Sequence, residues 1–313
     1  MTALISTIPR ARCCIAIAKD ERLERSTENQ APQAGNAQQA AAVKMGFLRQ
    51  ASLRARSLVS PANVLLSAQE EDRGIWEGPF WFTRQANRFV SARGVPTSLS
   101  TAAAVLSVAA RLPSCLIAVL PSDFWVARES VLREAIDRAF KSIEMIPDCI
   151  VTLGMIDTHP EIDEDYLVVG PNNNQKGAVI LARVNRPESR AAQQLINEGA
   201  MVASGILLGY AHAFAARIRK YWPHLARELT HTLESDCRPE GENRLSGQAY
   251  RHVPRSIINS IRLSSPTFPM RAFRVQGSGW CSRKPIKEIR PQSASDRRAG
   301  TFGPNLFTSD YPS

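Results

Sequence analysis

An aspartate that directly follows a short apolar run is the strongest candidate for a ligand-binding residue in this sequence. The run Cys115 to Leu120 is too short for a helix, and we predict that it forms an interior strand of a parallel sheet. Asp123 comes three residues later, at the carboxyl end of that strand, where open α/β sheets bind their ligands. Its alternative role is that of a helix N-cap or turn residue ahead of a helix predicted from Glu129 to Met145.

Other residue types that could do chemistry are present but are not grouped. The six cysteines contain no Cys-x-x-Cys pair, and Cys115 and Cys149 lie inside apolar segments, as small buried residues do. The five histidines show no spacing typical of metal ligands: His159, His212, His224, His231 and His252. We therefore predict neither a zinc site nor a disulfide framework.

The elements that must position Asp123 alternate between strands and helices along most of the chain. Periodicity predicts strands at Cys13–Ala18, Val64–Ala68, Cys115–Leu120, Cys149–Leu153, Tyr166–Val169, Gly177–Val184, Gly205–Gly209 and Met270–Gln276. It predicts helices at Phe47–Leu58, Thr101–Leu112, Glu129–Met145 and Ser189–Glu198, and a last helical region broken near Pro223. This alternation predicts an α/β fold with a mixed, mostly parallel sheet and helices on both faces.

Composition predicts how the chain is organised around that sheet. We expect a flexible N-terminus at 1–12, a main domain at 13–233, a C-terminal part of the same domain at 234–291 and a disordered tail at 292–313. Lys19 to Ala42 has few large apolar residues, and we predict a mobile loop there.

The formal net charge of +10 raises the question of an anionic partner. The arginines are spread along predicted amphipathic helices and the C-terminal tail, without any nucleic-acid-binding motif, so solvated helix faces are preferred over nucleic acid. No run of eighteen apolar residues occurs, and we expect a cytoplasmic protein without a membrane partner.

Several stretches, in one order along the chain, resemble the mannose-1-phosphate guanylyltransferases, a branch of the sugar-nucleotide pyrophosphorylases. The most specific is Ala118-Val119-Leu120-Pro121-Ser122-Asp123, which is close to the family's Leu-Pro-Ser/Ala-Asp-His motif. The other stretches are Phe47 to Pro61, Ser100 to Ala104, Val151 to Glu161, Gly199 to Ile206 and Val275 to Trp280. The resemblance spans roughly Cys13 to Ile289 and is to the short, single-module form of the family.

This resemblance implies a Rossmann-like nucleotidyltransferase fold and a reaction in which GTP and mannose 1-phosphate give GDP-mannose and pyrophosphate. It implies that Asp123 binds Mg²⁺, that Thr101 begins the helix facing the nucleotide and that Arg186 takes the place of a catalytic lysine. It further places Glu161 in a Pro-Glu turn at the site and Ser204 in the sugar-binding segment. The alternative for Arg186 is an ordinary surface arginine.

The chain differs from the family at the positions that would bind the phosphates, the metal ion and the sugar. The loop after Ala18 has no glycine and carries Asp20 and Glu21, which would repel a triphosphate. Ser282 replaces the second metal-binding carboxylate. Asp163-Glu164-Asp165-Tyr166 replaces a Gly-Tyr-Gly segment, and its carboxylates are expected to crowd and repel a sugar phosphate. Val202-Ala203 replaces the Trp-Asn pair that holds sugar hydroxyls.

Three functional hypotheses follow. The preferred one is a catalytically impaired relative, a pseudoenzyme that keeps the fold and could act as a binding or regulatory partner. The second is an active sugar-phosphate nucleotidyltransferase whose site has drifted. The third is a basic nucleic-acid-binding protein, whose affinity would fall as salt is added.

Overall fold

The protein is described by a computed structural model that covers residues 11–18, 34–93, 95, 97–156, 164–173, 175–236, 241–245 and 270–282. Side chains are not described at 34–44, 172–173, 235–236 and 282. All the elements discussed below belong to one unit of the chain.

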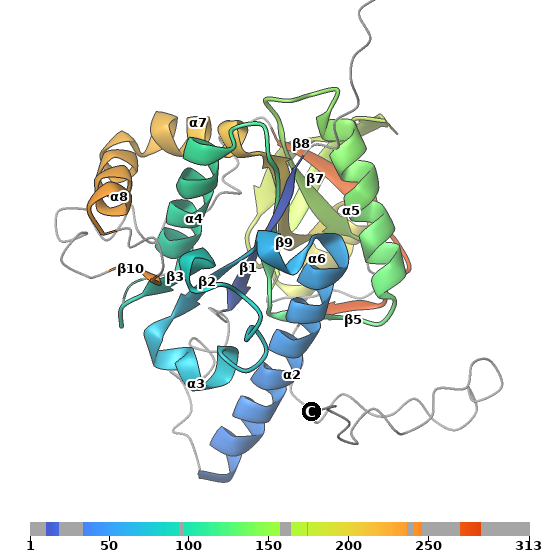
Figure 1. The fold of residues 1–313 in the computed structure, drawn as a ribbon. Helices are drawn as coiled ribbons and strands as arrows, with labels where there is room; N and C mark the ends of the chain where they lie inside the picture. Colours follow the sequence, from blue (N-terminus) through green and yellow to red (C-terminus); the bar gives the residue numbers. More distant parts are fainter. Residues whose placement is uncertain are drawn as a thin grey trace, which may run out of the picture. The chain divides into compact units, whose positions relative to one another are not determined.

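A mixed sheet forms the centre of this unit (Figure 1). The order of its strands is β10-β3-β2-β1-β4-β9-β6-β11-β8-β7. Their bounds are β1 Arg12–Ala18, β2 Val64–Gln69, β3 Arg88–Ser91, β4 Leu116–Pro121, β6 Ile150–Met155, β7 Tyr166–Asn173, β8 Gly177–Val184, β9 Met201–Tyr210, β10 Asn243–Leu245 and β11 Met270–Val275. A second sheet pairs two short strands, β5 Phe124–Val126 and β12 Trp280–Ser282.

The strands from β10 to β4 run parallel to one another, and β9 then enters antiparallel between β4 and β6. β4 is therefore an interior strand, as predicted, with β1 on one side and β9 on the other, but the predicted parallel pairing holds only on the β1 side. Its residues Leu116 to Leu120 are all buried, because an interior strand of such a sheet has helices over both faces. The carboxyl ends of β1, β2 and β4 consequently meet at one edge of the sheet.

Helices cover both faces of the sheet, which confirms the predicted α/β class. Their bounds are α2 Ala34–Leu58, α3 Arg73–Trp76, α4 Thr97–Arg111, α5 Glu129–Ile143, α6 Ser189–Asn197, α7 Ala211–Tyr221 and α8 Pro223–Asp236. On one face α4, α7 and α8 pack together, and α2 and α5 pack on the other. None of the described helices has the length and apolar character needed to cross a membrane.

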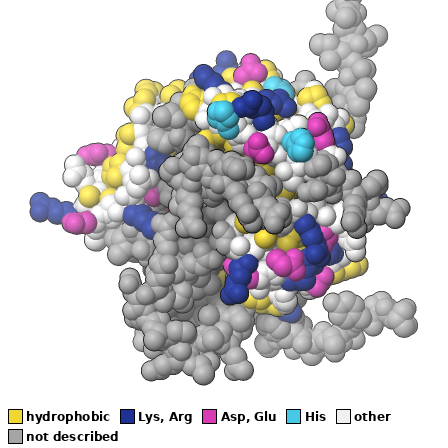
Figure 2. Space-filling model, turned by 90° about the vertical axis from the view of Figure 1, so that its left-hand side faces the viewer, with side chains coloured by type: hydrophobic (Ala, Val, Ile, Leu, Met, Phe, Trp, Pro, Cys, Tyr) yellow, Lys and Arg dark blue, Asp and Glu magenta, His cyan; other side chains and the backbone are white. Residues whose placement is uncertain are grey.

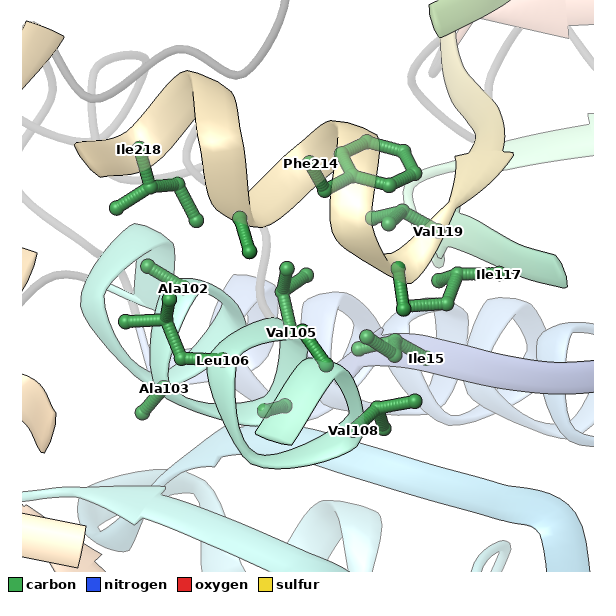
Figure 3. Packing of buried hydrophobic residues seen from close by; sticks show 14 of the residues in the cluster. Ile15, Ala102, Ala103, Val105, Leu106, Val108, Ile117, Val119, Phe214 and Ile218 are labelled. Carbon is green, nitrogen blue, oxygen red and sulfur yellow. The ribbon is translucent and has the colours of Figure 1, made fainter. Parts of the chain in front are cut away.

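One of the two main parts of the core lies between the sheet and the helices α4, α7 and α8 (Figure 3). Ile15 of β1 and Ile117 of β4 point toward Val105 of α4, and Phe214 of α7 lies above Val119. The strand residues come from alternating positions of each strand, whereas α4 is buried around most of its circumference, with Ala102 to Leu106 all in this cluster. Strand alternation therefore accounts for the buried strand residues, but a single apolar stripe does not account for α4.

The predicted mobile loop from Lys19 to Ala42 is wrong over its last part, because α2 begins at Ala34. Ala and Gln have high helix propensity, so the scarcity of large apolar residues did not prevent a helix. Residues 19–33 lie outside the described part of the chain, as do the predicted tail at 292–313 and residues 1–10. β1 begins at Arg12, whose guanidinium pairs with Asp137 of α5 at 2.8 Å.

The sheet also extends further along the chain than Leu233. β11 lies between β6 and β8, parallel to the first and antiparallel to the second. The strands β3, β5, β10 and β12 were not predicted, since each has three or four residues and is too short to show a period of two.

Charged side chains on the face in Figure 2 are of both signs. Lysine and arginine lie beside aspartate, glutamate and histidine, without forming one continuous basic surface in the part of this face that the structure describes. This arrangement is typical of solvated helix faces.

Candidate functional site

Asp123 lies at the carboxyl edge of the sheet, between the end of β4 and the start of β5. Pro121 at the end of β4 is paired in register with Ile17 of β1, so the chain leaves β1 next to the segment that carries Asp123. This is the position that open α/β sheets use for ligands. The carboxyl group is partly buried.

The N-cap alternative for Asp123 is wrong. The helix α5 begins at Glu129 with Arg128 at its N-cap, and the strand β5 separates Asp123 from it. Asp123 instead occupies a bend directly before β5, which agrees with the other half of that alternative, a turn residue ahead of the helix.

β12 brings the late part of the chain to this bend. Ser282 is paired in register with Phe124, the residue after Asp123, and Trp280 with Val126. Two backbone hydrogen bonds continue the pairing, from Ala127 N to Gly279 O at 3.2 Å and from Arg128 N to Ser278 O at 2.8 Å. The two positions that the resemblance assigns to metal-binding carboxylates are therefore neighbours, and one of them carries a hydroxyl.

Helix α2 is fixed to the same bend by two polar side chains that the sequence analysis did not single out. Arg54 is 3% exposed; its guanidinium lies over the ring of Phe124 at 4.3 Å and makes two hydrogen bonds to Glu129, at 2.7 and 3.0 Å. Gln50 donates to Val126 O at 3.0 Å and accepts from Val126 N at 3.4 Å, as a neighbouring strand would. Arg54 falls at helical spacing from Phe47, Ala51 and Leu58, on the apolar face of the helix, and this spacing is the local signal that could have singled it out.

Ser204 lies at the same edge, but its hydroxyl is used inside the protein. The Oγ donates to Leu153 O at 2.7 Å and accepts from Ile206 N at 3.1 Å, and the side chain is 1% exposed. The bond to Leu153 holds β9 against β6, where the register of the two strands shifts, and the bond from Ile206 lies within β9. The only O–H donor of Ser204 is therefore used inside the protein, so donating to a sugar would require the bond to Leu153 to be exchanged.

Thr101 is also buried and bonded within the protein. Its hydroxyl donates to Thr97 O at 2.8 Å and lies 3.0 Å from Ser67 Oγ, which in turn is 2.8 Å from Ser100 Oγ. This cluster ties the first turns of α4 to β2. Thr101 thus helps to position the start of α4 at the carboxyl edge.

Arg186 adopts an unusual backbone conformation. It is exposed and lies between β8 and α6 with φ of 39°, the one non-glycine residue with positive φ in the described part of the chain. The left-handed region costs a non-glycine residue roughly 1–2 kcal/mol, and such strain is concentrated at functional sites.

The acidic segment before β7 is less repulsive than its composition suggested. Asp165 forms a close ion pair with Arg183 of β8, and both side chains are nearly buried. Glu164 is buried as well. The predicted repulsion of a sugar phosphate by these two carboxylates is therefore corrected for Asp165, whose charge is balanced by Arg183.

Two predicted features of the site lie outside the described residues. They are Glu161 and the loop with Asp20 and Glu21. Within the described residues, no group of three or more His, Cys, Asp or Glu side chains could hold a metal ion.

The contact between Gly205 and Pro121 gives a direct test of how tightly this edge is built. Both Gly205 and Gly199 have left-handed φ, of 77° and 85°, but a Cβ on Gly205 would lie 3.0 Å from Pro121 Cγ, whereas one on Gly199 would meet nothing within 4 Å. We expect Gly199→Ala to lower the free energy of unfolding by about 1–2 kcal/mol through backbone strain alone. Gly205→Ala should cost about 1 kcal/mol more, because the Pro121 ring is held by a paired strand.

Urea denaturation of the two variants measures this difference. Equal losses would mean that the end of β4 moves freely to accept the methyl group, and Asp123 would then be held less firmly than the contacts indicate.

Comparison with known proteins identifies similar solved structures. The chain is similar to mannose-1-phosphate geranyltransferase from Thermus thermophilus, with 18% identity, a TM-score of 0.63 and coverage of 87% of this chain and 76% of that chain. It is also similar to mannose-6-phosphate isomerase from Helicobacter pylori, with 16% identity, a TM-score of 0.61 and coverage of 86% of this chain and 100% of that chain. No protein-family model and no curated protein sequence matches it. These likenesses show that the chain shares the α/β fold of these two proteins, in agreement with the fold class predicted from the sequence.

Proposed function

We propose that this chain is a catalytically impaired relative of the mannose-1-phosphate guanylyltransferases, which keeps the fold and the arrangement of the site without the full set of reacting groups. The observation that carries this proposal is the pairing of β5 with β12. It puts Ser282, the position where the resemblance expects a second carboxylate, beside the segment of Asp123, and this proximity supports the proposal.

The chemistry explains why that position matters. Nucleotidyl transfer builds negative charge around the reacting phosphorus, and the family neutralises it with a cation and a basic side chain. Two carboxylates hold the cation more firmly than one, whereas a serine hydroxyl contributes no charge. Ser282 therefore weakens the site even if every other group is in place.

The described residues do not fit a magnesium ion held by protein groups alone. Asp123 offers one carboxylate, and Ser282, the register partner of the next residue Phe124, is a neutral residue. Mg²⁺ needs six oxygen ligands in near-octahedral geometry and keeps several waters when the protein offers few. We infer that the ion would bind here only together with substrate phosphates.

The surroundings of Asp123 remain ordered in spite of these losses. Arg54 and Gln50 fix α2 to β5, and Ser204 fixes β9 to β6, all by buried or partly buried hydrogen bonds. These contacts hold the fold around Asp123 in place, which is what a binding or regulatory partner requires. GTP and a sugar 1-phosphate are the ligands that the resemblance implies.

One observation favours the second hypothesis, an active sugar-phosphate nucleotidyltransferase with an altered site. By the resemblance, Arg186 stands at the position of the family's catalytic lysine, and its backbone is strained. Its exposed guanidinium has the geometry to bind a phosphate in bidentate fashion. If this backbone conformation served no ligand, a substitution of Arg186 by glycine would remove the strain without loss.

Pyrophosphate release from GTP and mannose 1-phosphate, in the presence of Mg²⁺, tests the proposal. We expect no release above a protein-free control, because the missing carboxylate and the altered loop both weaken charge neutralisation. Clear turnover would contradict impairment, and Arg186→Ala would then be expected to abolish it while Arg190→Ala, at an exposed position in α6, leaves it unchanged.

A further inference from the structure

Two cysteines that are far apart in the sequence meet in the core, away from the carboxyl edge of the sheet. Cys13 lies in the amino-terminal half of β1, and Cys115 directly precedes β4. Their sulfur atoms are 3.1 Å apart, and Cys115 also packs in the same cluster of buried side chains. Both are free thiols in the structure.

The strand register explains this contact. Arg12 is paired with Leu116 and Cys13 with Ile117, so Cys115 lies diagonally across from Cys13 on the same face of the sheet. Cys14, the next residue, points to the opposite face and belongs to a different cluster. Backbone pairing thus selects Cys13 rather than Cys14 as the partner of Cys115.

The geometry points to a reversible disulfide between Cys13 and Cys115, formed by a two-electron oxidant of the peroxide class. A short movement of the two side chains brings the sulfurs to bonding distance, because the strands that carry them are already hydrogen-bonded neighbours. The bond would join the start of β1 to the turn before β4.

The two thiols differ in pKa and in exposure, and these differences assign their roles. The Cys115 thiol donates a hydrogen bond to Cys13, which lowers the pKa of Cys13; burial opposes this shift and the charge of Arg111 adds to it. The same bond raises the pKa of Cys115, and burial adds to that shift. Cys13 is also the more accessible of the two, at 7% against 1% exposed. Cys13 is therefore the attacking thiolate.

The reaction balances as follows. The Cys13 thiolate attacks one peroxide oxygen, the O–O bond breaks, and hydroxide leaves to become water, which yields a sulfenic acid. The sulfur of Cys115 then attacks the sulfur of Cys13, the S–O bond breaks, and a second water leaves with the Cys115 proton. Two thiols are oxidised by two electrons, one peroxide is reduced to two waters, and a dithiol reductant reverses the change.

Peptide mapping of the folded full-length protein tests this inference. After hydrogen peroxide treatment, alkylation of free thiols and tryptic cleavage, the segment from Cys13 to Lys19 should be found linked to the segment from Leu112 to Arg128. The link should disappear with dithiothreitol. It should be absent in Cys13→Ser and present in Cys14→Ser, a matched control in the adjacent position on the other face of β1.

A second measurement uses no variant. Thermal unfolding of the wild-type protein should occur at a higher temperature after peroxide treatment than after reduction, because the new bond restricts the unfolded chain. A link that uses Cys14, a link found only between two chains on a non-reducing gel, or a link formed only in urea would each overturn the inference. So would peroxide treatment that oxidises Cys281 and leaves Cys13 and Cys115 as free thiols.

Discussion

Calorimetric titration of the protein with GTP and Mg²⁺ is expected to show no binding, or binding several powers of ten weaker than that of an enzyme with an intact site. Three losses act in the same direction: no glycines in the loop after Ala18, the like charges of Asp20 and Glu21, and Ser282 in place of a carboxylate. A hydrogen bond to a charged group contributes about 1.5–3 kcal/mol, and about 1.4 kcal/mol corresponds to a factor of ten in affinity.

Restoring the carboxylate alone should not rescue transfer. Ser282→Asp puts a negative charge next to the segment of Asp123, yet the loop that follows β1 remains unsuited to a triphosphate. Pyrophosphate release should therefore stay at the level of Ser282→Ala, the matched control that removes the hydroxyl without adding a charge. If Ser282→Asp alone restored guanylyl transfer, the loop would not be disabled, and the active enzyme with an altered site would become the better explanation.

Truncation of the buried Phe214 side chain is expected to destabilise the fold strongly. Phe214→Ala should lower the free energy of unfolding by about 3–5 kcal/mol. Phe214 of α7 is fully buried, and its ring packs on the bare backbone of β9, where a Cβ on Gly209 would lie 3.1 Å from Phe214 Cε2. The side chain also lies above Val119 of β4 (Figure 3). The surrounding strands are paired on both sides and cannot collapse into the space that the ring leaves.

Guanidinium denaturation of this variant should be compared with Leu53→Ala. Leu53 lies on α2 with 65% of its surface exposed, so its truncation should change stability by less than about 0.5 kcal/mol. Similar losses in the two variants would mean that the packing around Phe214 contributes little, and the assignment of Phe214 to a tightly packed part of the core would be wrong.

The candidate site was partly predictable. Asp123 follows a run of apolar residues that is too short for a helix, and this local pattern was sufficient to place it at the end of an interior strand. The hydrogen-bond partners of Thr101 and Ser204 were not predictable, because a hydroxyl can bind a ligand or a buried backbone carbonyl equally well. Only the packing of α4 on β2 and of β9 on β6 shows that both hydroxyls are bonded within the protein.

The sequence by itself determined the alternation of strands and helices, the burial of β4 and the missing glycines after β1, because periodicity and residue type are local properties of the chain. Tertiary structure alone decided which distant residues meet. It paired Ser282 with Phe124, balanced Asp165 with Arg183, buried Arg54 against Phe124 and brought Cys13 to Cys115. Each of these contacts depends on strand order and register, which arise from the packing of the whole sheet, and no short stretch of sequence contains that information.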